Sequence, residues 1–186
     1  IVTTSNQDAK IAWYKADGIG GFTGQQIVSN AYLNPGDIEL ADLNADGNLD
    51  LIYPNGSRFG WFEGNGDGTW GNDNTLSFTQ PTTRIFAVAD FDNDGDLDIV
   101  NRFGTNFLLE TNNGAGVFTE TTILNIGTTN INSLISSDVD ADGFMDIVFT
   151  NVGSDYLGYL RNQGGGSFGS LTIISNTLDA AQTVVA

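Results

Sequence analysis

The sequence predicts an all-β fold made of four consecutive copies of one repeat of 48 residues. Three acidic segments of nine residues begin at Asp42, Asp90 and Asp138, so their first residues lie 48 residues apart both times. Short apolar runs surround each segment, and Gly, Asn and Asp separate these runs as they do in turns. No segment has a sustained apolar period of 3.6 residues, which argues against helices.

The repeat is clearest in its second copy, which contains four apolar runs of strand length. These runs are 85–89, 97–101, 106–110 and 117–123, and the turn 112–116 precedes the last of them. Four such strands joined by short turns make an antiparallel sheet of the meander type. An aromatic residue follows the glycine-rich turn in every copy, namely Phe22, Trp70, Phe118 and Phe168.

A four-stranded sheet of this size cannot bury both of its faces alone, whereas radially stacked sheets bury both. All-β repeats of about 40–50 residues are therefore typical of β-propeller blades. We expect one propeller domain or propeller fragment over residues 1–186, with repeats at about 1–41, 42–89, 90–137 and 138–186. A solenoid or a sandwich is the alternative, but solenoid coils are shorter and a sandwich does not repeat in register.

The two ends of the chain match the strands on either side of an acidic segment. Ile1–Val2 matches Ile99–Val100, and Val184–Ala186 matches Ala87–Ala89. We therefore expect a circularly permuted, partial or oligomer-completed propeller. The terminal strands would then pair within the chain or between chains, because exposed strand edges accept partners.

Each acidic segment has the ligand chemistry of a calcium loop. Side-chain oxygens occupy positions 1, 3, 5 and 9, glycine occupies position 6, and the carbonyl of position 7 faces the expected ion. Oxygen ligands favour Ca²⁺ over zinc or copper, and a flexible loop favours it over Mg²⁺. The segments lack the position 12 Glu and the helical flanks of an EF-hand. We therefore expect three structural Ca²⁺ sites, each within a β-hairpin.

The predicted ligands follow from these positions. In the first site they are Asp42, Asn44, Asp46, the carbonyl of Asn48, and Asp50. In the second they are Asp90, Asp92, Asp94, the carbonyl of Asp96, and Asp98. In the third they are Asp138, Asp140, Asp142, the carbonyl of Phe144, and Asp146. Asn44 removes one charge, so the first site is expected to bind weakest. Plain polar turns are the alternative, but such crowded carboxylates repel one another without a cation.

Composition excludes several functions. The chain has 23 acidic and 6 basic residues and a net charge of −17, so neither nucleic acids nor anionic membranes are expected partners. No apolar run approaches the length of about 18 residues that spans a bilayer. The chain has no His and no Cys, which removes Ser-His-Asp, Cys-His and zinc-hydrolase arrangements. We expect no enzymatic activity.

The run WYKADGIGGF, the later run DLNADGNLDLI and their copies resemble the FG-GAP-like (VCBS) repeat, which also underlies the integrin α-subunit propeller. The resemblance covers essentially the whole chain. It implies a calcium-binding β-propeller of a secreted or cell-surface protein, typically with seven or eight blades. Such propellers bind glycans or proteins, or accompany a catalytic domain.

The expected function is therefore a binding or adhesion module for a glycan or an extracellular protein. Arg58 and Arg102 lie at nearby positions of two repeats, each followed by an aromatic residue, Phe59 or Phe103. Together they could hold a sugar or an acidic group, and packing over a blade edge is the alternative. A self-assembling half-propeller or filament subunit is the second hypothesis. An accessory propeller of a polysaccharide-degrading enzyme is the third.

Overall fold

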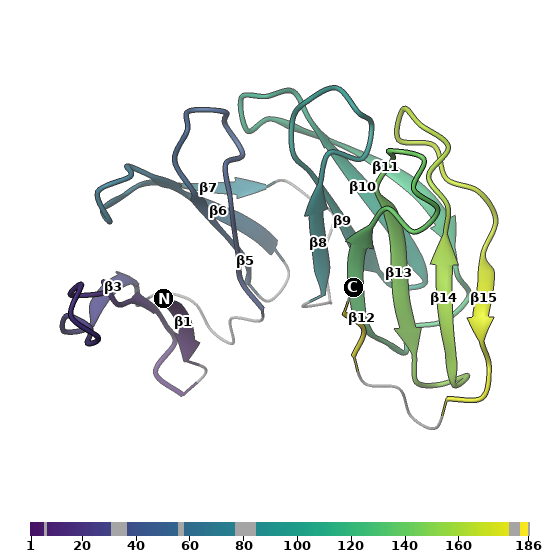
Figure 1. Cartoon of the computed structure of the whole chain (residues 1–186), viewed down its shortest axis with the longest axis horizontal. Coiled ribbons are helices and arrows are strands. Elements are labelled where there is room, and N and C mark those ends of the chain that lie inside the picture. Colours follow the sequence, from purple (N-terminus) through teal and green to yellow (C-terminus); the bar gives the residue numbers. More distant parts are fainter. Residues whose placement is uncertain (6, 31–36, 56–57, 77–84, 179–182, 186) are drawn as a thin grey trace. The chain divides into compact units, whose positions relative to one another are not determined.

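The computed structural model describes residues 1–5, 7–30, 37–55, 58–76, 85–178 and 183–185. All regular structure in these residues is β-strand (Figure 1), and they contain no helix long and apolar enough to cross a membrane. The strands form four antiparallel sheets, which confirms the all-β class and the blade architecture of a β-propeller. The chain divides into unit 1 (Ile1–Asp42 and Asp46–Arg84) and unit 2 (Leu43–Ala45 and Ile85–Ala186).

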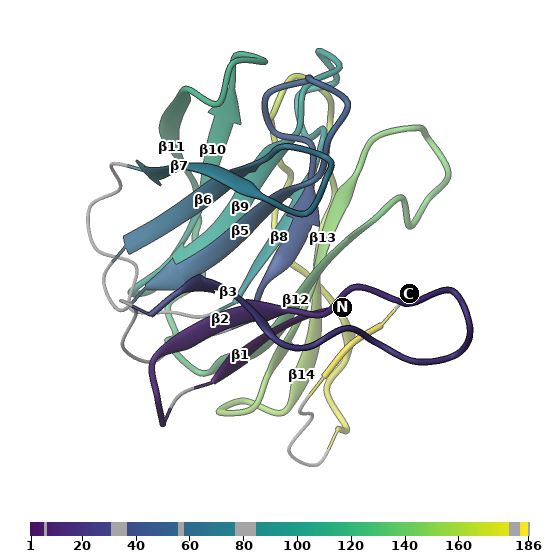
Figure 2. The same cartoon turned by 90° about the vertical axis from the view of Figure 1, so that its left-hand side faces the viewer.

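Unit 1 contains two sheets, which Figure 2 shows from the side of the N-terminus. The first sheet has the strand order β1 (Val2–Ser5), β2 (Lys10–Trp13), β3 (Gln26–Ser29). The second has the order β4 (Glu39–Ala41), β5 (Asp50–Asn55), β6 (Arg58–Gly64), β7 (Trp70–Leu76). Unit 1 has a buried apolar cluster that consists of Ile11, Leu51, Tyr53 and Phe62. The Tyr53 and Phe62 rings stack in this cluster, with their centroids 5.3 Å apart.

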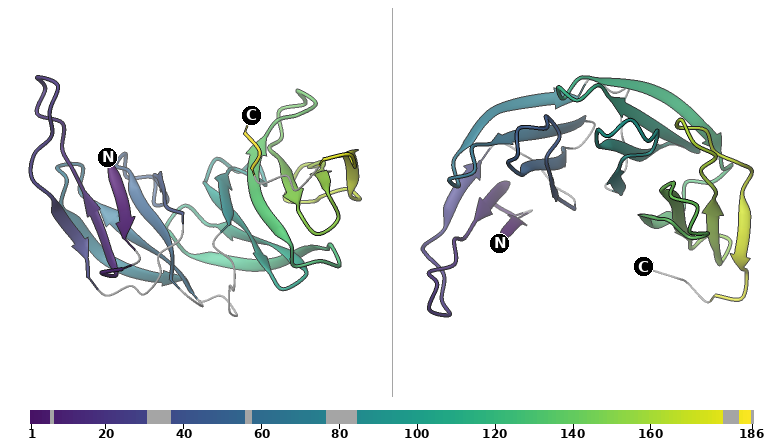
Figure 3. Two further views of the ribbon diagram at one scale, coloured as in Figure 1. Left: turned by 90° about the horizontal axis from the view of Figure 1, so that it is seen from below. Right: turned by 45° about the horizontal axis from the view of Figure 1, so that its top comes forward.

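Unit 2 contains two four-stranded sheets that lie next to each other (Figure 3). The third sheet consists of β8 (Phe86–Ala89), β9 (Asp98–Phe103), β10 (Asn106–Asn112) and β11 (Phe118–Asn125). The fourth consists of β12 (Ile131–Ser137), β13 (Asp146–Asn151), β14 (Tyr156–Leu160) and β15 (Thr172–Ser175). Phe107 of the third sheet meets Phe149 of the fourth edge to face, with ring centroids 4.8 Å apart. The apolar faces of the two sheets thus share one core.

The strands follow from the apolar pattern of each run. β13 is buried at every residue, as expected for an inner strand covered on both faces. β14 alternates between buried and partly buried residues, which is the period of a strand with one covered face. The four strands of the third sheet coincide with the four runs predicted from the second copy of the repeat. That part of the prediction is confirmed.

The glycine-rich turns occupy equivalent places in the first and fourth sheets. Isolated bridges join Ala16 to Phe22 and Asn162 to Phe168, so Ala16 and Asn162 hold the same repeat position. The predicted repeat boundaries at residues 42, 90 and 138 cut the second, third and fourth sheets after their first strands, because each boundary lies at an acidic loop. Val184 lies beside β12, where its amide donates to Ser133 Oγ at 3.2 Å, and Ala186 lies outside the described residues.

Candidate metal centres

Each acidic loop joins the first strand of a sheet to the second. The first loop (Asp42–Asp50) follows β4, the second (Asp90–Asp98) follows β8, and the third (Asp138–Asp146) follows β12. Position 9 is the first residue of the next strand in all three loops, and its carboxylate is fully buried (Asp50, Asp98 and Asp146). The loops are therefore attached to the sheets at both ends, and positions 4 to 6 in the middle of each loop are exposed.

The carboxylate of position 1 organises each loop from inside. In the second loop Asp90 accepts hydrogen bonds from the amides of Asp94 at 3.1 Å and Gly95 at 3.0 Å. Asp42 and Asp138 accept the same pair of bonds in the other two loops. Glycine at position 6 has a φ of 88° to 99°, which only glycine adopts without strain. The chain consequently folds back so that its oxygens converge.

The buried aspartate of position 9 links the loop to the glycine-rich turn. Asp98 accepts hydrogen bonds from Phe91 N at 2.9 Å and from Asn112 N at 2.8 Å. Burial raises the pKa of the Asp98 carboxyl to about 6, and these backbone donors oppose the shift. Asp146 accepts the equivalent bond from Asn162 N at 2.7 Å. The carboxylate oxygens thus have fixed positions beside each loop.

Two groups of carboxylates converge closely enough to hold a metal ion. Carboxylate oxygens of Asp90, Asp92 and Asp98 lie within 4.8 Å of one another, and those of Asp138, Asp140 and Asp146 do the same. Burial raises the pKa of Asp92, and the nearby charges of Asp94 and Asp90 raise it further. An all-oxygen donor set in a glycine-containing loop matches the preferences of Ca²⁺. Three of the predicted side-chain ligands are therefore brought together in each of these two loops.

The third loop also has a basic neighbour that the sequence reasoning missed. The Arg161 guanidinium, just beyond β14, forms ion pairs with Asp140 through Nε and with Asp142 through Nη2, the latter at 2.7 Å. Only the strand register reveals this contact, because Arg161 is 19 residues from Asp142 in sequence. The signal available in the sequence was a basic residue at a repeat position where the second and third sheets have Glu63 and Thr111, and the first has Lys15.

The predicted ligand-binding residues lie mostly inside the protein. Phe59 is fully buried, Arg102 is buried and Phe103 is partly buried. The Arg102 guanidinium donates from Nη1 to the carbonyl of Gly104 at 2.7 Å. Arg58 begins β6, and its side chain lies outside the described part of the chain.

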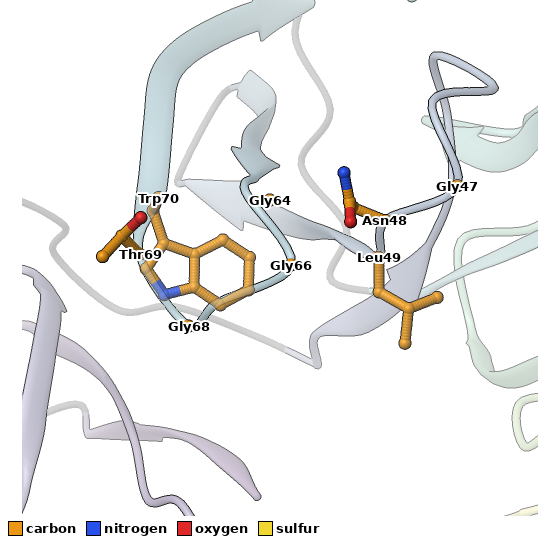
Figure 4. Close-up of a pocket in the computed structure, with 8 residues that line it drawn as sticks. All are labelled: Gly47, Asn48, Leu49, Gly64, Gly66, Gly68, Thr69 and Trp70. Carbon is orange, nitrogen blue, oxygen red and sulfur yellow. The ribbon is translucent and has the colours of Figure 1, made fainter.

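A cavity of about 320 Å³ adjoins the first loop in unit 1 (Figure 4). Its lining residues are Gly47, Asn48, Leu49, Gly64, Gly66, Gly68, Thr69 and Trp70. Figure 4 shows Asn48 on one side of Gly66 and the Trp70 indole on the other. A Cβ at Gly66 would lie 2.2 Å from Asn48 Oδ1, so glycine is required where Asn48 covers the turn. Asn48, whose carbonyl is a predicted ligand of the first loop, therefore also lines the cavity.

Comparison with known proteins decides the family. The model of the FG-GAP-like repeat matches residues 1–53 and 42–101, which together exceed half of the chain. The chain belongs to the FG-GAP-like repeat family. This confirms the resemblance of the acidic loops and turns, and the FG-GAP-like repeats account for the regular spacing of the sheets. The comparison with curated proteins found no match.

Two solved structures share the fold of this FG-GAP-like chain. A lectin of Agrocybe aegerita that recognises non-reducing terminal N-acetylglucosamine superposes with a TM-score of 0.71 and 21% identity. The match covers 94% of this chain and 48% of the lectin, so the chain spans about half of the lectin's length. A holotoxin pore of Photorhabdus luminescens gives a TM-score of 0.53 and 19% identity, over 96% of this chain and 9% of that one.

Proposed function

We propose that the chain is a calcium-stabilised binding module of a secreted or cell-surface protein, and that its ligand is a glycan. In this proposal, calcium occupies the three acidic loops and has a structural role. The ion would neutralise carboxylates that otherwise repel one another, and it would fix the loop beside the cavity. We further propose that the module binds its ligand without catalysing a reaction.

The cavity of unit 1 is the observation that carries the proposal. Its walls combine the Trp70 side chain, the Asn48 amide, the Thr69 hydroxyl and exposed glycine backbone. An aromatic face packs against the C–H groups of a sugar, while amides and hydroxyls bond its hydroxyl groups. The cavity carries no charged side chain among its lining residues, which suits a neutral ligand.

Two further observations support a glycan. The lectin with the same fold recognises a terminal N-acetylglucosamine. Asn48 contributes its side chain to the cavity, and its carbonyl is a predicted ligand of the first calcium site. Binding of calcium would therefore order a residue that touches the sugar. This arrangement favours a binding module whose affinity depends on calcium.

The proposal is tested by screening a glycan array with and without chelator. Titration with N-acetylglucosamine as the probe then measures the affinity. Trp70→Ala should weaken sugar binding by about tenfold or more, as expected for a central aromatic contact. Asn48→Ala should also weaken it while leaving calcium affinity unchanged, because the carbonyl stays. Phe22→Ala, which removes an exposed aromatic residue outside the cavity, is the matched control. Unchanged binding in Trp70→Ala would place the sugar elsewhere, and an array without any hit would overturn a glycan ligand.

Assembly is a second candidate, which the first sheet favours. β1 is the outer strand of the three described strands, whereas β5, β9 and β13 each lie between two strands. A groove beside β1 is lined in part by Val2, Thr3 and Ile38. The edge of a sheet can accept a strand from another chain. Light scattering in calcium tests this: a dimer or larger species supports assembly, and a monomer at high concentration contradicts it.

A further inference from the structure

The third loop is partly neutralised by a residue of the protein itself. The Arg161 guanidinium contacts Asp140 and Asp142, which are positions 3 and 5 of the loop. The Arg161 side chain is 50% exposed, and those of Asp140 and Asp142 are 35% and 23% exposed. The planar guanidinium therefore bridges two of the carboxylates that a cation would use, in a place from which it can swing into solvent.

The second loop has aspartate at the same four positions, carries Asp96 where the third loop has Phe144, and has a different neighbour. The amides of Asn112 and Asn162 bond to Asp98 and Asp146 in the same way, so the residues before them occupy equivalent positions. Those residues are Thr111 in the third sheet and Arg161 in the fourth. Within the described residues, no ion pair reaches the second loop. The two loops therefore differ in the positive charge at this position and in the additional carboxylate of Asp96 in the second loop.

We propose that Arg161 is an internal competitor for the divalent cation at the third loop, so that this loop binds calcium more weakly than the second. The inference rests on the proposed calcium role. Asp140 Oδ2 and Asp142 Oδ2 face the guanidinium, so an ion that takes these oxygens as ligands competes with it. Calcium must displace Arg161 from these carboxylates. The free energy of calcium binding at the third loop is therefore reduced by the energy of the two ion pairs. Arg161 also holds the loop together when calcium is absent.

The test exchanges the two residues and follows each loop separately. The amides of Gly47, Gly95 and Gly143 donate to the position 1 carboxylates, so their NMR resonances report the first, second and third loops. In a calcium titration of the parent protein, Gly95 should shift at lower calcium than Gly143. Arg161→Thr should lower the Gly143 midpoint by about three- to tenfold, since two partly exposed ion pairs are lost. Thr111→Arg should raise the Gly95 midpoint by a similar factor of about three to ten.

Lys15→Thr is the matched control, because Lys15 is an exposed basic residue at the same repeat position of the first sheet. It should move none of the three midpoints. A Gly143 midpoint that is unchanged or raised in Arg161→Thr would overturn the proposal while leaving calcium binding intact. Absence of any calcium-dependent shift at the three glycines would overturn the calcium role itself, and this inference with it.

A melting experiment separates competition from an ordinary stabilising contact. In chelator, Arg161→Thr should melt at a lower temperature than the parent protein, because the carboxylates of the third loop lose their counter-charge. In saturating calcium the two proteins should melt together, since the ion has already displaced Arg161. An equal loss of stability in both conditions would identify Arg161 as a structural residue only and contradict the proposal.

Discussion

The third and fourth sheets share one frame of hydrogen bonds and differ in the charges placed around it. In both, the position 9 aspartate accepts the amide of an asparagine in the glycine-rich turn. The neighbours at equivalent positions are Asn101, Glu110 and Thr111 in the third sheet, and Phe149, Leu160 and Arg161 in the fourth. The two sheets thus keep the same geometry through their hydrogen bonds to backbone amides, while a few side chains give each loop its own electrostatics.

Loss of the buried aspartate should have the largest effect, and it should be equal in the two sheets. Asp98→Ala and Asp146→Ala each leave buried backbone amides without an acceptor, which costs about 3–5 kcal/mol of unfolding free energy in chelator. Denaturant unfolding measures this, with the exposed Asp37→Ala as the control. Unequal losses would break the idea of a common frame.

The buried glutamate of the third sheet should make stability depend on pH. Burial raises the pKa of Glu110 from its ordinary value near 4.5 to about 8. As the pH rises, the Glu110 carboxyl loses its proton at a lower pH in the unfolded chain than in the folded protein. The folded state therefore loses stability between about pH 4.5 and 8, and the loss is complete above about pH 8. Glu110→Gln keeps an acceptor for Asn101 and should abolish that loss, on the order of 2–4 kcal/mol.

Denaturant unfolding of both proteins between pH 5 and 9 measures this difference. Asp37→Asn, which neutralises an exposed carboxylate, should keep the parent's pH dependence. A parent protein whose stability is flat across this range would contradict the role assigned to Glu110. The equivalent residue of the fourth sheet, Leu160, is buried and has no titratable group. If Glu110→Gln showed the same pH dependence as the parent protein, a group other than Glu110 would be its cause.

The asparagine of each turn should matter to the same degree in both sheets. Asn112 Nδ2 donates to Leu43 O at 2.7 Å and to Leu97 O at 3.1 Å. Asn162 Nδ2 donates to Phe91 O at 2.7 Å and to Met145 O at 3.0 Å. Removing either side chain leaves buried carbonyls unpaired, at a cost of about 1–3 kcal/mol. Thermal unfolding of Asn112→Ala and Asn162→Ala tests this, and a loss confined to one of them would contradict it.

Calcium should give the smallest effect for any single loop. A site with an affinity of ~0.1 mM gains roughly 1.8 kcal/mol at ~2 mM calcium. Chelation should therefore lower the melting temperature of the parent protein. Asp94→Asn should remove more of this gain than Asp142→Asn, because Arg161 already offsets the third loop. Equal effects of these two substitutions would show that the loops are not tuned separately.

Much of this fold can be predicted from the sequence, because the same pattern of apolar runs and acidic segments occurs several times. The four runs of the second copy became β8 to β11, and the acidic segments became the loops between first and second strands. Three predicted side-chain ligands converge in each of the second and third loops, since a nine-residue loop with glycine at position 6 places its oxygens locally. Such features depend only on residues that are close in sequence.

Features that depend on contacts across the sheet were not predictable. The partnership of Arg161 with the third loop requires the pairing of β13 with β14. Arg102 and Phe59 looked like surface residues of variable turns, yet the strands carry them into buried positions. Glu110 gave no clear sign of burial either, because it ends an apolar run and the polar residues Thr111 and Asn112 follow it. Composition and spacing do not encode these side-chain environments.

The bond from Asn162 to Phe91 has a consequence for synthesis on the ribosome. The two residues are 71 positions apart, so the second loop emerges well before the side chain that caps its carbonyl. At about 5–20 residues per second, that delay is roughly 4–14 seconds. During this interval the nascent loop lacks one of its buried partners. The second and third acidic loops are thus followed by the asparagines that bond to the loop of the preceding repeat. These hydrogen bonds can therefore form only in the order in which the repeats are translated.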